Sequence, residues 1–259
     1  MTASLLLLPN RISLTAEDTL PEATLCQARR CRRFLAENAK SARAFLKSIG
    51  HPGPIAELEI IEIGHAPDPT QFDAWLAPLL EGVATAVVSE SGCPGVADPG
   101  AELVARAAEL GIAVKPLVGP CSILLTLMAS GMNGQNFRFV GYLPIHEDER
   151  RSALLKLEAE SRRGETELFI ETPYRNSQML AAMVELLAPD TRITVATDVT
   201  GIEEAIVTHT VRDWKRLEHT LPKLPTVFAM SARRTPQAKA SSGRPTQPRT
   251  RFKPRYNKS

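Results

Sequence analysis

VATAVVSESGCPGVADPGAELVARAAELG occupies residues 83–111 and decides the fold. Its apolar run at 83–89 is typical of a parallel strand that is covered by helices on both faces. Asp98 and Pro99 stand where a helix begins, and Gly111 stands where one ends. The twelve residues at 89–100, which join the strand to the helix, contain three glycines and two prolines. A strand, a tight loop and a helix in this order predict one unit of a mostly parallel α/β sheet.

The alternation of strand and helix continues in both directions from this unit. In the first half we expect further strands at 4–8, 32–37, 58–63 and 113–117, and helices at 21–30, 38–49, 70–81 and 121–130. In the second half we expect strands at 137–140, 167–171, 192–197, 202–208 and 225–230, and helices at 148–162, 173–187 and 211–217. The last strands follow one another closely, which predicts some antiparallel pairing. The sequence therefore predicts two α/β domains, at 1–134 and 135–230, and a tail at 231–259.

The tail differs in composition from the rest of the chain. The 259 residues are 43% hydrophobic and 23% charged, as in ordinary globular proteins, and the apolar runs are too short to span a membrane. Nine basic and no acidic residues lie at 231–259, so the net charge of +2 becomes −7 over the first 230 residues. Such a segment is expected to be disordered, and its cations favour a polyanion such as RNA. A merely solubilising tail is the alternative.

Several function classes are disfavoured by what the chain lacks. Its four cysteines form no Cys-x-x-Cys pair and no secretion signal opens it, which predicts a protein of the reducing cytoplasm. Its five histidines are scattered, so we expect no metal site. Gly-x-Gly-x-x-Gly, Walker-type, Gly-x-Ser-x-Gly and His-Glu-x-x-His motifs are absent. A nucleoside triphosphatase, a dinucleotide enzyme and a zinc hydrolase are therefore disfavoured.

Three loops remain where chemistry is expected, each after a predicted strand. They span residues 89–100, 118–122 and 171–175. Open α/β sheets bind ligands at the carboxyl ends of their strands, and glycines let a ligand approach the main chain. Any one of these loops alone is better explained as an ordinary turn, with Asp98 or Thr172 capping a helix. Three of them together favour a binding site.

Taken together, these loops resemble a known family. Residues 89–94 and 98–100 stand where that family has Ser-Asp-Ala-Gly-Thr-Pro and Asp-Pro-Gly, and residues 171–175 stand at its Glu-Ser-Pro-His-Arg. Weaker matches are Gly119, Pro120 and Ser122 to Pro-Gly-Pro-Ser-Ala, 141–144 to Gly-Phe-Leu-Pro, and 36–38 with 41–43 to Ala-Glu-Asp-Thr. Over residues 5–230 the chain resembles the class III S-adenosylmethionine-dependent methyltransferases, or tetrapyrrole methylases. It is most similar to the branch that methylates a cytidine 2′-hydroxyl of small-subunit ribosomal RNA.

The resemblance implies more than the residues alone predict. It implies two α/β domains with a cleft between them for S-adenosyl-L-methionine, a homodimer, ribosomal RNA as the substrate, and no membrane contact. The cofactor contacts that it implies are Pro9, Glu90, Ser91, Gly92, Cys93, Val96, Cys121, Ser122, Ile123, Ile170, Thr197 and Asp198. Methyl transfer to a hydroxyl benefits from a general base, for which Glu90, Asp98, Glu171 and Asp198 are equal candidates.

The chain departs from the family pattern in its N-terminal loop, residues 8–13. There the family has Thr-Pro-Ile-Gly-Asn-Leu and this chain has Leu-Pro-Asn-Arg-Ile-Ser, which keeps only Pro9. In the main loop, Glu90 replaces an Asp and Cys93 a Thr, and 196–198 read Ala-Thr-Asp for Ala-Arg-Glu. The resemblance therefore supports cofactor binding better than it supports a ribosomal substrate.

Other functions stay open beside this one. A non-catalytic RNA-binding relative would explain the altered N-terminal loop, and a small molecule such as a tetrapyrrole would serve as another methyl acceptor. A cysteine hydrolase is a third alternative, because Cys93 lies in a glycine-rich loop and Cys121 at a predicted helix N-terminus. No histidine is placed by the sequence to act as its base, which disfavours this class.

Overall fold

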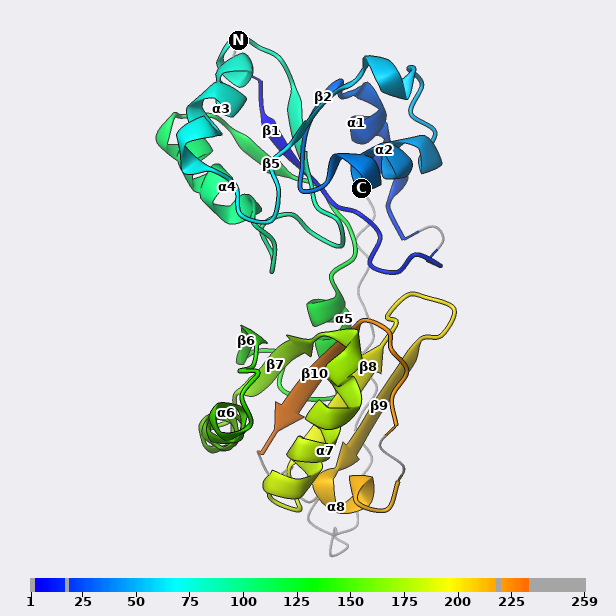
Figure 1. The fold of residues 1–259 in the computed structure, drawn as a ribbon, viewed down its shortest axis with the longest axis vertical. Coiled ribbons are helices and arrows are strands. Elements are labelled where there is room, and N and C mark those ends of the chain that lie inside the picture. The colour runs from blue at the N-terminus through cyan, green and yellow to red at the C-terminus, as the bar shows by residue number, and fades with distance from the viewer. Residues whose placement is uncertain (1–2, 17–18, 218–219, 233–259) are drawn as a thin grey trace, which may run out of the picture.

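A computed structural model of the chain describes residues 3–16, 19–217 and 220–232. Within these ranges the strands form two sheets of five, ordered β3-β2-β4-β1-β5 and β6-β7-β10-β8-β9. Figure 1 shows the first sheet above the second, with α5 (Ser122–Ser130) between them. None of the helices in these ranges has the length and apolar character that crossing a membrane requires. The prediction of a disordered tail falls, beyond residue 232, outside the described residues.

The first sheet is wholly parallel, as predicted, and helices cover both of its faces. Its strands are β1 (Leu5–Leu8), β2 (Arg33–Ala36), β3 (Glu59–Glu62), β4 (Thr85–Val88) and β5 (Val114–Pro116). Its helices are α1 (Glu22–Arg30), α2 (Ala39–Ser48), α3 (Phe72–Leu80) and α4 (Gly100–Glu109), with short 3-10 turns at Ile55–Glu57 and Pro69–Gln71.

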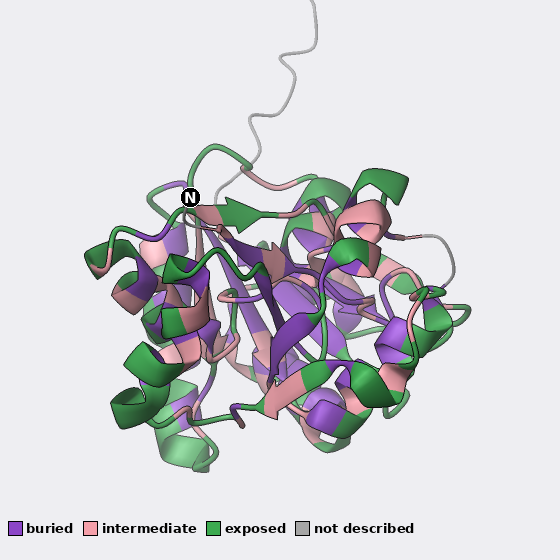
Figure 2. Ribbon diagram, turned by 90° about the horizontal axis from the view of Figure 1, so that it is seen from above, coloured by how far each residue is buried: buried purple, intermediate pink, exposed green. Residues whose placement is uncertain are grey.

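Alternation along β4 explains why its apolar run is continuous. Ala86 and Val88 pack into the cluster that contains Phe45 of α2. Val87, between them, packs with Leu76 of α3 on the opposite face. Figure 2 shows these buried strands surrounded by helices that expose their outer sides. Each large apolar side chain buried in this way contributes about 1.5–3 kcal/mol, so both helical layers hold the sheet.

Capping residues fix the ends of these helices largely as predicted. The Asn38 side chain accepts hydrogen bonds from the main-chain N–H of Lys40 and Ser41, both at 3.0 Å, and so starts α2. Gly131 ends α5 in the left-handed conformation, at φ +64°. Asp98 Oδ1 accepts from the main-chain N–H of Gly100 at 2.9 Å. Asp98 therefore caps α4, although Pro99 and not Asp98 occupies the N-cap position.

The second sheet is mixed, which confirms the expected antiparallel pairing. Its strands are β6 (Phe137–Tyr142), β7 (Thr166–Glu171), β8 (Arg192–Thr197), β9 (Ala205–Thr210) and β10 (Thr226–Ser231). β6 and β7 are parallel, whereas β10 runs antiparallel to both β7 and β8, and β9 antiparallel to β8. β9 begins at residue 205 and not at 202, because Asp198 and Thr200 take positive φ angles of 46° and 72° in a turn.

Helices also cover both faces of the second sheet. On one face lie α6 (Glu147–Ser161), α7 (Asn176–Leu186) and α8 (Val211–Trp214), with a 3-10 turn at Pro173–Arg175. On the other lies α5 (Ser122–Ser130), whose Ile123 and Leu127 pack against Val227 and Ala229 of β10. Thus α5 covers the second sheet although it precedes residue 134. The domain boundary at 134/135 stays a prediction.

Candidate functional site

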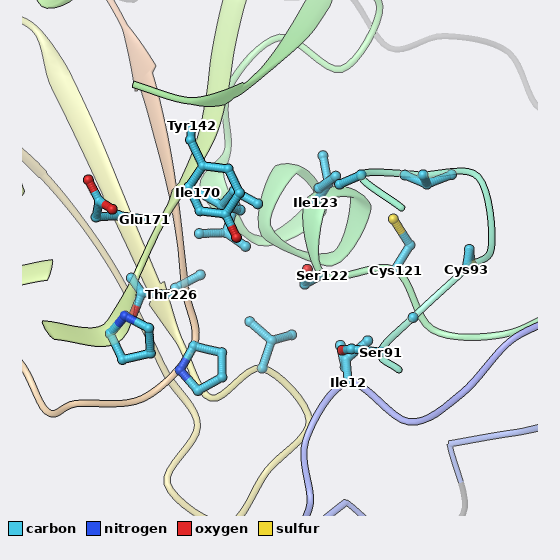
Figure 3. A pocket seen from close by; sticks show the side chains of 18 of the residues that line it. Ile12, Ser91, Cys93, Cys121, Ser122, Ile123, Tyr142, Ile170, Glu171 and Thr226 are labelled. Carbon is cyan, nitrogen blue, oxygen red and sulfur yellow. The ribbon is translucent and has the colours of Figure 1, made fainter. Parts of the chain in front are cut away.

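Loops from both halves of the chain enclose a cavity of about 360 Å³. This volume is within the range of about 300–1,000 Å³ that is usual for small-molecule sites. Figure 3 shows Ile12, Ser91 and Cys121 on one side and Ile170, Glu171 and Thr226 on the other. The lining residues are Ile12, Ser91, Gly92, Cys93, Val96, Ala97, Cys121, Ser122, Ile123, Tyr142, Ile170, Glu171, Thr172, Pro173, Ala196, Val199, Pro225, Thr226 and Val227.

The strand order explains how the first half contributes to this cavity. β4, β1 and β5 are neighbours in a parallel sheet, so the loops that follow them leave the same edge. That edge faces the second sheet (Figure 1). Ile12 follows β1, residues 91–97 follow β4, and residues 121–123 follow β5. The site is therefore placed where open α/β sheets generally bind their ligands.

Side chains outside the cavity hold the loop at 89–100 in place. The amide of Asn10 donates to the carbonyls of Ser89 and Glu90, both at 3.2 Å, and the Asn10 main-chain N–H donates to Gly92 at 2.9 Å. Asp98 Oδ1 accepts from the N–H of Gly95 at 3.1 Å and of Gly100 at 2.9 Å. Burial raises the pKa of Asp98, and these two N–H donors offset only part of the rise. Its carboxylate is thus engaged within the loop.

Two glycines allow the loops to approach one another. Gly92 has a φ of +70°, and a Cβ there would lie 3.3 Å from Ile12 Cγ2 and 3.6 Å from the Pro120 carbonyl oxygen. At Gly119 a Cβ would lie 2.3 Å from Pro9 Cβ, so no other residue fits without movement. Pro9 is buried and lies against Gly119, so it supports the loop that carries Cys121.

The thiol of Cys93 lies between two of these loops. Its Sγ donates to the carbonyl oxygen of Pro120 at 3.4 Å. Burial raises the pKa of Cys93, and the nearby Cys121 thiol adds to the rise. A thiol with a raised pKa is a poor nucleophile at neutral pH, and no histidine is among the described residues that line the cavity. These observations argue against a cysteine hydrolase.

In the second half, an ion pair shapes the loop after β7. The Glu171 side chain is 1% exposed and accepts from the Thr172 N–H at 2.6 Å and from Arg175 Nε at 3.0 Å. The Asn176 amide donates to the Leu224 carbonyl at 2.8 Å and to Thr226 Oγ1 at 2.9 Å. Oε1 of Glu171 is therefore held by the loop that follows β7.

Eight of the twelve contacts that the resemblance implies line the cavity. These are Ser91, Gly92, Cys93, Val96, Cys121, Ser122, Ile123 and Ile170. Pro9, Glu90, Thr197 and Asp198 do not. Thr197 Oγ1 shares a buried hydrogen bond with Thr226 Oγ1 at 3.1 Å, and Asp198 Oδ2 accepts from the Glu203 N–H at 3.0 Å. Glu90 turns to Ser41, whose hydroxyl donates to it at 3.0 Å.

Sequence reasoning missed several lining residues, and the topology explains the most important of them. We expected ligand contacts at the carboxyl ends of strands. Because β10 is antiparallel to β7 and β8, it brings its first residues to that same edge. Pro225, Thr226 and Val227 line the cavity for this reason. Tyr142 was missed because its strand extends two residues beyond the predicted end.

Comparison with known proteins agrees with this geometry. The family model described as Tetrapyrrole (Corrin/Porphyrin) Methylases matches residues 8–214. A protein of Vibrio cholerae named "Ribosomal RNA small subunit methyltransferase I" is 36% identical over 128 residues, which are 49% of this chain and 43% of the relative. A protein of the same name from Neisseria meningitidis serogroup B is 31% identical over 176 residues, 68% of this chain and 57% of the relative. The chain thus spans about half the length of the curated relatives that it matches.

A solved structure shares the fold. The uroporphyrin-III-C-methyltransferase of Thermus thermophilus superposes with a TM-score of 0.53 at 18% identity, covering 90% of this chain and 93% of that one. The family model spans most of the residues that build both sheets and the cavity between them. The chain therefore belongs to the tetrapyrrole methylase family, as its loop motifs predicted.

Proposed function

We propose that this chain binds S-adenosylmethionine in the cavity and transfers the methyl group to a ribose 2′-hydroxyl of small-subunit ribosomal RNA. The supporting observation is the cavity itself, which three strand-to-helix loops and the start of β10 enclose in a member of a methylase family. The acceptor is proposed from the motif resemblance and from the names of the relatives.

The residues of the cavity fit such a cofactor. Ile123, Ile170 and Val227 offer apolar walls for a flat base. Gly92 lines the cavity and has no side chain, so a ligand can approach its main chain. The first N–H groups of α5, at Ser122 and Ile123, have no partner within the helix and suit the polar parts of a ligand. The cofactor supplies an activated methyl group when bound.

The contribution of this chain to the transfer is alignment. The loops at 91–97 and 121–123 would hold the cofactor, and loops of the second half would close over it. In well-aligned systems, positioning alone contributes up to about 7–11 kcal/mol to the lowering of a reaction barrier. Asp98 and Asp198 are not among the described residues that line the cavity, and each accepts hydrogen bonds within its own loop, so these two predicted bases serve better as supports.

The test has a binding arm and a transfer arm. Calorimetry of the full chain with S-adenosylmethionine should show binding, and a radiolabelled methyl group should pass to small ribosomal subunits that lack the modification. Mass spectrometry of the nucleosides should then show a 2′-O-methyl group. No binding at millimolar cofactor would favour the non-catalytic relative. Transfer to a tetrapyrrole and not to RNA would refute the ribosomal acceptor.

We also propose the homodimer that the resemblance implies. One chain has a mass of 28.3 kDa. Light scattering at micromolar concentration should give about twice that mass, and a mass near that of one chain would contradict the proposal.

A further inference from the structure

Three side chains beside the cavity meet at the carboxyl edge of the first sheet. Glu37 directly follows β2, and His65 and Glu90 lie shortly after β3 and β4. The strand order β3-β2-β4 makes these three strands neighbours, so the three side chains come together. His65 Nδ1 lies 2.5 Å from Glu37 Oε1, and His65 Nε2 lies 4.0 Å from Glu90 Oε2. The result is an imidazole between two carboxylates.

Glu37 fixes the orientation and the tautomer of this imidazole. Its side chain is 13% exposed, and its second oxygen accepts from the Glu90 main-chain N–H at 3.0 Å. A carboxylate only accepts hydrogen bonds, so the proton of neutral His65 lies on Nδ1 and the lone pair on Nε2. The His65 side chain is 76% exposed, which leaves Nε2 accessible to a large substrate. This is the arrangement by which a carboxylate prepares a histidine as a general base.

The dyad of His65 and Glu37 lies against the loop at 89–100 and is not among the described residues that line the cavity. Glu90, its third member, immediately precedes Ser91, the first cavity-lining residue of the loop at 89–100. At the other end of that loop, the charges of Glu37 and His65 both act on Asp98. The dyad therefore contacts the loop that supplies Ser91 to the cavity, and the His65 ring is open to solvent.

We infer that His65 is the general base that accepts the proton of the acceptor hydroxyl, with Glu37 as its positioning residue. The inference rests on the proposed function. The hydroxyl oxygen forms a bond to the methyl carbon while its O–H bond breaks and the proton passes to His65 Nε2. The bond from the methyl carbon to sulfur breaks, and its electron pair stays on sulfur. One proton thus moves to the protein as the sulfonium becomes a neutral thioether.

The surrounding charges stabilise the product of this step. Protonated His65 lies between the carboxylates of Glu37 and Glu90, and Asp98 adds a third negative charge nearby. An exposed ion pair without a catalytic role contributes only about 0–1 kcal/mol to stability, so a structural role and a catalytic role predict different results.

Replacing His65 separates these roles. We expect His65→Gln to lower kcat on small ribosomal subunits by about 100-fold or more, which is typical of a lost general base, while calorimetry shows unchanged cofactor affinity. Added imidazole should restore part of the rate. The wild-type kcat should rise with pH as the base loses its proton, and this rise should be missing in the variant. His146→Gln is the matched control, because His146 is exposed and its side chain caps no N–H of α6.

A second variant and a spectroscopic readout complete the test. In Glu37→Gln the new amide can donate to Nδ1, which permits the unproductive tautomer, so kcat should fall with unchanged cofactor affinity. Nitrogen-15 NMR of the wild-type chain should show the proton of neutral His65 on Nδ1. A proton on Nε2, or a His65→Gln variant with wild-type kcat and pH profile, would overturn the inference and leave the proposed function intact. A wild-type chain that methylates no RNA would overturn both.

Discussion

A valine at position 92 tests whether the loop at 89–100 binds the cofactor or is only a turn. Gly92 lines the cavity with a φ of +70°. A Cβ there would touch Ile12 at 3.3 Å and the Pro120 carbonyl at 3.6 Å, distances at which neighbours yield slightly but need not separate. The remaining carbons of valine must extend beyond these contacts. We expect them to occupy space that the cofactor needs.

The effect divides into a backbone cost and a cavity cost. A side chain in the left-handed region costs about 1–2 kcal/mol of folding stability. Crowding a filled site by a few carbons costs about 1–3 kcal/mol, which corresponds to about 5- to 150-fold in affinity. Gly111 isolates the first cost, because its φ is +69° and nothing lies within 4 Å of its Cβ position.

Two measurements on matched variants give the answer. Urea unfolding should show a similar loss of stability for Gly92→Val and Gly111→Val. Calorimetry with S-adenosylmethionine should show a loss of affinity for Gly92→Val alone. A folded Gly92→Val protein with wild-type affinity would refute the reasoning, because the loop would then be only a turn. Equal loss of affinity in the Gly111→Val protein would refute it too, because the effect would then be a general one.

Three further predictions concern a carboxyl group, a thiol and the basic tail. Because burial raises the pKa of Asp98, its contribution to stability is present at acid pH and is lost as the pH rises through that raised value. Asp98→Asn should therefore raise the free energy of unfolding near pH 7 and change it little near pH 3, as urea unfolding would show. The raised pKa of Cys93 predicts slow alkylation by iodoacetamide at neutral pH and faster alkylation in alkali. Because Cys93 lines the cavity, S-adenosylmethionine should protect it. Fast alkylation of Cys93 at pH 7, measured by mass spectrometry, would contradict the prediction. Deleting residues 233–259 spares β10 and removes nine cations, so RNA affinity should fall. The slope of log affinity against log salt concentration should flatten by about 0.7–0.9 for each phosphate that the shortened chain no longer binds. An unchanged slope would show that the tail binds no phosphate.

Most of the fold follows from local patterns along the chain. The order of strands and helices was predictable because runs such as 83–89 and caps such as Asn38 and Gly131 are local signals. The order of strands in the second sheet was not, because β10 comes last in the chain and yet lies between β7 and β8. Nor does the sequence indicate that α5 packs on the second sheet, since its apolar residues surround the helix.

The candidate site was predictable as loops but less well as side chains. The loops at 91–97 and 121–123 were found because glycines and prolines mark them after apolar runs. The direction of the Glu90 side chain depends on Ser41, which is distant in the sequence. The direction of the Asp198 side chain depends on a turn in which Asp198 itself has a positive φ. His65 was missed altogether. Its neighbours Glu37 and Glu90 approach it only through the strand order β3-β2-β4, which no spacing in the sequence reveals.

The N-terminal loop at 8–13 shows how a divergent segment preserves the cavity. Asn10, which interrupts the family pattern, holds the loop at 89–100 through two hydrogen bonds from its side-chain amide and one from its main-chain N–H. Arg11 extends to the Ser48 hydroxyl at 3.4 Å and is not among the described residues that line the cavity. Thr15 Oγ1, just beyond, accepts from the Ile202 N–H at 3.0 Å and so links the two halves. Since Asn10 holds the loop at 89–100 and Ile12 alone of residues 8–13 lines the cavity, we expect the divergence to preserve the proposed cofactor loops and to alter the cavity wall at Ile12.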